Sequence, residues 1–219
     1  MQPVGILLRI GIGILMLDAL LELAFISSMV FWLNHGASGP YETRVGDSTF
    51  FLHSAPLHLL TDQGHTSNGA AGTAFVLIGL GGILALLLRR SRHGILALWY
   101  RFWLVLTVPA VLLTLAALIY VNVVTRQHAG QVINVAVAST LDARPYPLKT
   151  WTPDNWFSAV LKLDLVRKHT ADTISHHLRI IHGWRWNLIP LFITELFVCI
   201  LAFLDALTER RGKRPPSSF

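Results

Sequence analysis

The apolar residues of the chain gather in four long stretches that are separated by more polar segments. Each stretch reaches about 20 residues, the length that a helix needs to cross the hydrocarbon core of a bilayer. The stretches predict membrane-spanning helices at residues 10–33, 69–88, 95–124 and 186–207. Long loops separate them at residues 34–68 and 125–185, and a Pro- and Ser-containing tail at residues 208–219 is predicted to be disordered. We interpret the chain as a single four-span membrane domain.

The two long loops carry folding signals of their own. Thr152-Pro153-Asp154 predicts a helix start, with an N-cap hydroxyl, a proline at the first helical position and an acid in the first turn. The apolar residues that follow recur on one side, so we expect an amphipathic helix on the membrane face or across the bundle. Residues 165–182 predict a second loop helix, and residues 50–60 predict an interfacial or packed loop element. The predicted fold is an all-α membrane protein, a four-transmembrane-helix bundle with an extramembrane cap of short amphipathic helices.

Composition and charge agree with a membrane protein. Of the 219 residues, 53% are hydrophobic and only 14% are charged, whereas about a quarter of a soluble domain is charged. The net charge is +6, but the basic residues lie near span ends, so we expect the lipid bilayer, and no nucleic acid, as a partner. One side carries Arg9, Arg89, Arg90, Arg92, Arg210, Arg211, Lys213 and Arg214, and the other side carries Arg44, Arg126, Arg179 and Arg185. The positive-inside rule then predicts that both termini are cytoplasmic and both long loops lie outside.

Five ionisable residues fall within the predicted spans, where a charge costs at least about 2.5–3.5 kcal/mol and such groups are usually paired, protonated or exposed to water. Two interpretations are open. In a structural one, Arg101 pairs with Asp18 or Asp205. Protonated Glu22 and Glu195, which we expect at similar depth, then hydrogen-bond between helices. In a functional one, Asp18, Glu22 and Glu195 form a proton or cation relay.

Three glycines of the second span recur near one helical face. They are Gly72, Gly79 and Gly82. Small residues along one face let helix backbones approach closely, so these glycines predict helix contact within the bundle or between copies of the chain.

Four histidines lie near the predicted outer ends of the spans. They are His35, His65, His128 and His182. Loop histidines commonly bond to backbone or lipid headgroups, but histidine also binds metals and titrates near neutral pH. A metal site or a sensor of outside pH is therefore a weaker alternative, since no recognised metal-binding spacing is present.

The chain contains no recognisable reaction motif, so no catalytic residue is assigned and no cofactor is expected. Its one cysteine, Cys199, excludes an internal disulfide. We interpret the protein as non-enzymatic, organising or sensing at the membrane through lateral helix contacts and its outer loops, in a homo-oligomer or with other membrane proteins. A small proton-linked transporter or channel that uses the buried carboxylates is the alternative. A membrane enzyme with a metal held by histidines is the third interpretation.

In topology the chain resembles the tetraspan proteins of the claudin type and the fungal PalI type, with four spans, inner termini and two outer loops. Those families carry paired cysteines in the first outer loop, and residues 34–68 contain none. The segments YPLKTWTPDNWFSAVL and GWRWNLIPLF resemble a fungal family of membrane proteins. The resemblance implies the four-span fold, and it carries no activity or functional residue to this chain.

Overall fold

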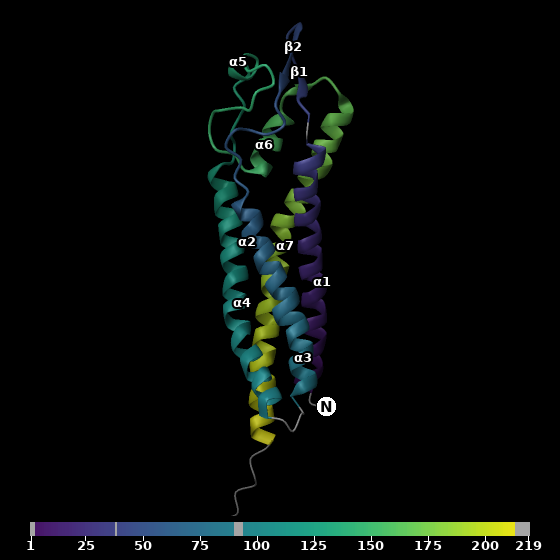
Figure 1. The fold of residues 1–219 in the computed structure, drawn as a ribbon, viewed down its shortest axis with the longest axis vertical. Coiled ribbons are helices and arrows are strands. Elements are labelled where there is room, and N and C mark those ends of the chain that lie inside the picture. The colour runs from purple at the N-terminus through teal and green to yellow at the C-terminus, as the bar shows by residue number, and fades with distance from the viewer. Residues whose placement is uncertain (1–2, 38, 90–93, 213–219) are drawn as a thin grey trace, which may run out of the picture. The chain divides into compact units, whose positions relative to one another are not determined.

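Four long helices dominate the computed structural model of the chain (Figure 1). The structure describes residues 3–37, 39–89 and 94–212, with side chains described to residue 209 and not for 94–97. Four helical stretches are long and apolar enough to cross a membrane, namely Pro3–Gly36, Asp62–Leu88, Leu98–Gln127 and Lys168–Glu209. They confirm the prediction of four candidate spans and indicate a multi-pass membrane protein.

Each stretch corresponds to one or more helical elements of the fold. The first is α1 (Pro3–Phe31) with the π-helix η1 (Trp32–Gly36). The second is α2 (Asp62–Thr73), the π-helix η2 (Ala74–Leu80) and α3 (Gly81–Leu88). The third belongs to α4 (Gly94–Gln127) and the fourth to α7 (Lys168–Gly212). The remaining elements are α5 (Val135–Ala138), α6 (Pro153–Val160), β1 (Tyr41–Val45), β2 (Ser48–Leu52) and β3 (Asp164–Leu165).

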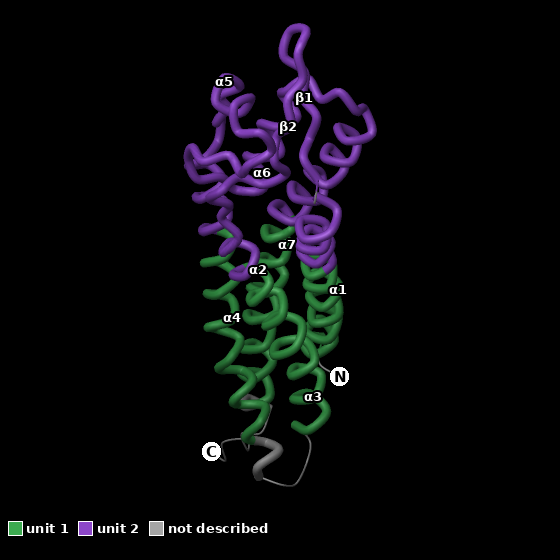
Figure 2. Tube along the Cα trace, turned by 45° about the horizontal axis from the view of Figure 1, so that its top comes forward, with its two compact units in different colours: residues 1–23, 67–118, 187–219 green, residues 24–66, 119–186 purple. Residues whose placement is uncertain are grey.

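The chain divides into two compact units (Figure 2). Unit 1 comprises residues 1–23, 67–118 and 187–219, and unit 2 comprises residues 24–66 and 119–186. Both of the predicted outer loops fall almost entirely within unit 2, whereas α1, α4 and α7 contribute residues to both units.

Unit 1 is a four-helix bundle whose buried positions recur at alternating spacings of three and four residues. On α1 the buried positions are Leu8, Ile12, Leu15, Ala19 and Glu22, and on α7 they are Leu188, Leu191, Glu195, Val198, Ala202 and Asp205. On α4 the same spacing buries Trp103, Thr107, Ala110, Thr114 and Ala117. This is the seven-residue repeat that keeps one face of each helix toward its neighbours. Two glutamates, an aspartate and two threonines therefore occupy positions that the repeat assigns to the core.

Two of the three predicted packing glycines permit close helix approach in unit 1. A Cβ on Gly82 would lie 2.8 Å from Trp103 Cζ2, and one on Gly79 would lie 2.5 Å from Met16 Cγ. A Cβ on Gly72 would meet no atom within 4 Å, so this glycine packs against no described side chain or neighbouring helix. The helical spacing identified the right face for Gly79 and Gly82 but extended it to Gly72, about two turns too far.

Unit 2 contains a small sheet, and the expectation of an all-α fold is wrong in this part of the chain. The strand order is β2-β1-β3, and both pairings are antiparallel. β1 and β2 form a hairpin whose two-residue turn places Gly46 at φ +57°, a conformation that suits glycine. β3 comes from the second predicted loop and pairs with β1 from the first. The two loops therefore fold together.

The core of unit 2 is built from large aromatic side chains. Trp151 and Trp156 are fully buried and pack edge to face, and Tyr146 contacts both rings. The Trp156 indole donates a hydrogen bond to the Ser54 carbonyl over 2.8 Å. Bridges at Pro56–Tyr146 and Leu59–Trp151 extend the pairing of the two loops along these aromatics.

α6 begins where the sequence predicted. Pro153 is its first residue, and the Thr152 hydroxyl accepts a hydrogen bond from the Asn155 backbone amide. Of the two expected placements, the one on the membrane face is wrong, because residues 153–160 are buried on nearly every side, with only Ser158 partly exposed. The polar side chains are paired inside unit 2, and Asn155 donates to the Thr125 carbonyl over 2.9 Å.

Two further expectations about the last third of the chain are wrong. Residues 165–182 do not form a separate helix, because all but the first three belong to α7, which runs unbroken for 45 residues. α7 also continues through residue 212, so residues 208–212 of the predicted disordered tail are helical. The rest of the tail and the turn residues Arg90, Arg92 and His93 lie outside the described residues, as do Lys213, Arg214 and the side chains of Arg210 and Arg211.

Candidate functional site

Buried carboxyl groups are the most unusual chemical feature of unit 1. Glu22 on α1 is fully buried, and its Oε2 accepts a hydrogen bond from the Asn187 side chain over 3.0 Å. Its Oε1 has no hydrogen-bond partner in the described structure. Asp18, one turn earlier and half-buried, accepts a hydrogen bond from the Thr194 hydroxyl over 3.0 Å. Both acids of α1 therefore meet neutral polar groups of α7.

The Glu195 carboxyl group is buried with fewer hydrogen bonds than that of Glu22. It is 1% exposed, and neither carboxyl oxygen has a hydrogen-bond partner among the described residues. The Thr114 hydroxyl of α4 lies near it without a hydrogen bond of normal geometry and is itself unpartnered. Thr194, the neighbour of Glu195, lies beside Asp18, so Glu195 is at the level of Asp18 and not of Glu22 as expected. Counting from span ends failed because packing, not span length, sets the register of α1 against α7.

Asp205 does form an ion pair, but with a different arginine from the one predicted. Arg89, just after α3, contacts the Asp205 carboxylate and lies 2.8 Å from Glu209. Tyr100 also donates a hydrogen bond to Asp205 over 3.2 Å. Burial alone lowers the pKa of Arg89, but the carboxylates of Asp205 and Glu209 outweigh burial and raise it. This cluster fixes the end of α3 to α4 and α7.

Arg101 is not buried, and the predicted pairing with Asp18 or Asp205 is wrong. Its side chain is exposed, and no ion pair of Arg101 exists among the described residues. Two residues of α4, a rotation of about 200°, separate it from the core position Trp103, whose ring faces α3. The sequence placed Arg101 at the right depth but could not supply its angular position on the helix.

Two of the candidate outer histidines contact backbone carbonyls of their own helices. His35 stacks on Phe31 and contacts its carbonyl, and His128 contacts the Val124 carbonyl. His65 is exposed on α2. Among the described residues, no three His, Cys, Asp or Glu side chains are arranged to hold a metal ion.

His182 differs from the other three because it meets a carboxylate. Its Nε2 lies 3.2 Å from Oδ1 of Asp154, which is 7% exposed. Arg185, three residues along α7, lies 3.5 Å from the other oxygen and also donates to Asn122 over 3.2 Å. The cluster joins α6, α4 and α7 within unit 2 and places two basic side chains beside the buried Asp154 carboxyl.

Sequence reasoning missed the partners of the acids more than the acids themselves. Asn187 lies eight residues and Thr194 one residue before Glu195 on α7, and both side chains meet α1. Both are polar residues in an apolar stretch, and their seven-residue separation is a helical signal that could have placed them on one face with Glu195. The pairing of Arg89 with Asp205 has no such signal, because 116 residues separate them.

Comparison of the chain with protein-family models, curated proteins and solved structures finds no match. Function is therefore argued from the arrangement of the residues alone. Buried neutral carboxyls can bind and release a proton or can join helices through hydrogen bonds. A folded unit built from two loops can present a surface to another molecule.

Proposed function

We propose that this multi-pass membrane protein is non-enzymatic and organises or senses at the membrane through unit 2 and lateral helix contacts. The observation that supports the proposal is the joint folding of the two long loops. β3 of the second loop pairs with β1 of the first, and three buried aromatics lie between the loop segments. Loops that only connected spans would need no such shared core, so we infer that unit 2 has a recognition role.

Unit 2 also offers apolar side chains for recognition. The paired segments 50–57 and 143–148 expose Phe51, Leu57 and Leu148 at 47%, 57% and 42%. The segments are joined by hydrogen bonds from Ala143 to the Phe51 carbonyl and from Leu57 to the Tyr146 carbonyl. Large apolar groups gathered on paired segments are typical of a contact surface for another protein. A second copy of this chain or another membrane protein is the proposed partner.

The test compares association of the full chain with and without this surface. Phe51→Ser, Leu57→Ser and Leu148→Ser are combined in one variant, and Val132→Ser, which removes an equally exposed apolar group elsewhere in unit 2, is the control. The number of fluorescent copies in each membrane cluster is counted. We expect the triple variant to disperse the clusters and the control to keep them. Unchanged clusters in the triple variant would contradict the proposal.

A proton-linked transporter or channel is the second candidate. Glu22 and Glu195 support it, because three of their four carboxyl oxygens are buried without a hydrogen-bond partner in the described structure. Purified protein in vesicles would then move protons down a pH gradient, and Glu22→Gln or Glu195→Gln would abolish the flux. Glu42→Gln, on β1, is the control. If both variants keep normal clustering and the native protein shows no flux, this candidate is excluded.

We also propose an orientation, with both termini cytoplasmic and both long loops outside. The basic residues near the span ends support cytoplasmic termini and outer loops. A fluorescent tag after residue 219 is expected to be shielded from a membrane-impermeant quencher in intact cells, and a tag in the turn at Gly46 is expected to be quenched.

A further inference from the structure

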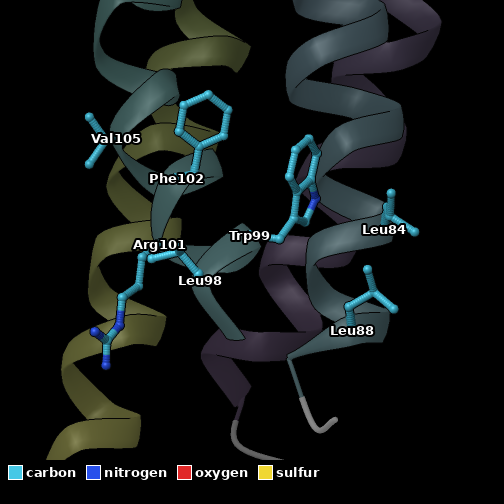
Figure 3. A pocket seen from close by; sticks show the side chains of 7 residues that line it. All are labelled: Leu84, Leu88, Leu98, Trp99, Arg101, Phe102 and Val105. Atoms are coloured by element: carbon cyan, nitrogen blue, oxygen red, sulfur yellow. The ribbon is translucent and has the colours of Figure 1, made fainter. Parts of the chain in front are cut away.

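Unit 1 has an apolar groove on its surface between α3 and the beginning of α4. Figure 3 shows the side chains that line it, and its volume is about 670 Å³. Apolar side chains from both helices form most of the lining, and several are strongly exposed, among them Leu84 at 46%, Leu98 at 61% and Val105 at 65%. The complete lining is Leu84, Leu88, Leu98, Trp99, Arg101, Phe102 and Val105. On a helix that spans a membrane, such a groove faces acyl chains.

Among the described residues that line the groove, Arg101 is the one that carries a charge. Its guanidinium points toward the beginning of α4, while Phe102 and Val105 lie in the opposite direction along the groove (Figure 3). Helical side chains lean toward the N-terminus of their helix, and a long basic side chain in a membrane reaches for the interface in this way. The groove therefore has a cationic end and an apolar end.

The cationic end lacks an anion within the described structure. The nearest acids of unit 1 along α7, Asp205 and Glu209, are both held by Arg89. No described carboxylate pairs with Arg101. Arg101 also lies at the end of α4 that the charge distribution predicts to be cytoplasmic, and the cytoplasmic leaflet is the one rich in anionic lipids. An arginine with no ion-pair partner among the described residues, next to an acyl-sized groove, is complementary to a lipid phosphate.

We propose that this groove binds one anionic phospholipid, with an acyl chain between α3 and α4 and the phosphate on Arg101. The apolar walls cannot select this lipid by themselves, because acyl chains are as apolar as leucine and gain little by leaving other lipid. The groove fixes the position of the lipid, and the arginine selects its headgroup. A basic residue near the membrane surface is worth about 1 kcal/mol with anionic lipid, so the expected preference is about fivefold.

The charge is tested by competition between two lipids. Purified full-length protein is equilibrated with equal amounts of phosphatidylglycerol and phosphatidylcholine, and bound lipids are counted by native mass spectrometry. We expect one bound lipid with about a fivefold preference for phosphatidylglycerol. Arg101→Gln should abolish the preference. Arg126→Gln, which removes an exposed arginine of the same helix outside the groove, should retain it.

The groove itself is tested by filling it. Val105→Trp is expected to reduce bound lipid of both headgroups, whereas Val108→Trp, at an exposed position of α4 outside the groove, is expected to leave it unchanged. Both sites are exposed, so neither change disturbs the core. Equal binding of the two lipids by the native protein would overturn the proposal, as would an unaltered preference in Arg101→Gln. A lipid-free dimer that Val105→Trp dissociates would show that a second copy occupies the groove, and would also overturn it.

Discussion

The two units of the molecule solve the same packing problem with different residues. Unit 1 packs leucine, isoleucine and alanine side chains around Trp103, and Gly82 lets Trp103 approach the backbone of α3. Unit 2 fills its core with large rings such as Trp151 and Trp156. Helices in lipid gain stability from close contact because apolar burial drives little association there, whereas a core that excludes water gains most from large apolar side chains.

Unit 2 also differs from the middle of unit 1, away from the Arg89–Asp205 pair, in what surrounds a buried acid. Asp154 of unit 2 lies against His182 and Arg185. Glu22 and Glu195 of unit 1 meet neutral groups or nothing within hydrogen-bond distance. A buried carboxylate without a cation is costly, and a neutral carboxyl avoids most of that cost. The comparison shows basic side chains beside the buried acid of unit 2 and none bonded to Glu22 or Glu195 among the described residues.

The largest effect is expected from Trp156→Ala. The change removes a fully buried indole, its hydrogen bond to Ser54 and its ring contacts, and loss of a large core aromatic costs about 3–5 kcal/mol. Limited proteolysis of the purified protein should show early cleavage in the long loops. Trp186→Ala, at a side chain 55% exposed, is the control and should be cleaved like the native protein. Equal protease resistance of the two variants would show that unit 2 has no aromatic core.

The next largest loss of stability is expected when the paired acid Asp154 is made neutral. Asp154→Asn leaves Arg185 and His182 without their anion, and breaking a buried ion pair costs about 3 kcal/mol. The midpoint of thermal unfolding should fall by several degrees. Asp142→Asn makes the same chemical change at an exposed residue with φ +46°, a conformation that asparagine tolerates, and should leave the midpoint unchanged. A midpoint for Asp154→Asn within one degree of native would mean that the cluster does not hold α6.

The close approach of helices in unit 1 is tested by a matched pair of glycines. Gly82→Ala would place a Cβ 2.8 Å from the ring of Trp103. That ring cannot easily move, because it is fully buried and its indole donates to the Ile78 carbonyl. We expect a loss of about 1–3 kcal/mol in detergent-mixture unfolding. Gly72→Ala meets open space and should be neutral or stabilise the helix by up to about 1 kcal/mol. Equal effects would show that close approach at Gly82 is not needed.

Hydropathy predicted the four long helices because a span is encoded locally, in about 20 consecutive residues. The start of α6 was equally local, in Thr152 and Pro153. The sheet was not, since β3 is two residues long and pairs with a strand more than a hundred residues earlier. Its only clear local signal was the turn at Gly46. A strand this short forms only through contacts with a distant segment, and a single sequence does not reveal those contacts.

The candidate site shows the same limit. Sequence position revealed that Glu22, Glu195 and Asp205 lie in apolar helices, and the three- and four-residue spacing of their apolar neighbours explains why they are buried. The choice of Arg89 over Arg101 as the partner of Asp205 depends on the rotation of α4 and on where α3 ends. A rotation of one residue is 100° on a helix, so a correct depth with an unknown rotation gave the wrong arginine.

The smallest stability effect is expected at Glu195, and its size separates the two candidate functions. Glu195→Gln replaces a carboxyl that makes no hydrogen bond within the described structure by an amide of the same shape. If that carboxyl is neutral and only fills space, the free energy of unfolding should change by less than about 1 kcal/mol, because no net interaction is lost. Clustering should then also be native. Loss of proton flux with unchanged stability would instead assign the carboxyl a role in transport, since an amide cannot carry the proton. A large loss of stability would contradict both interpretations, because it would mean that Glu195 is charged and paired inside the bundle.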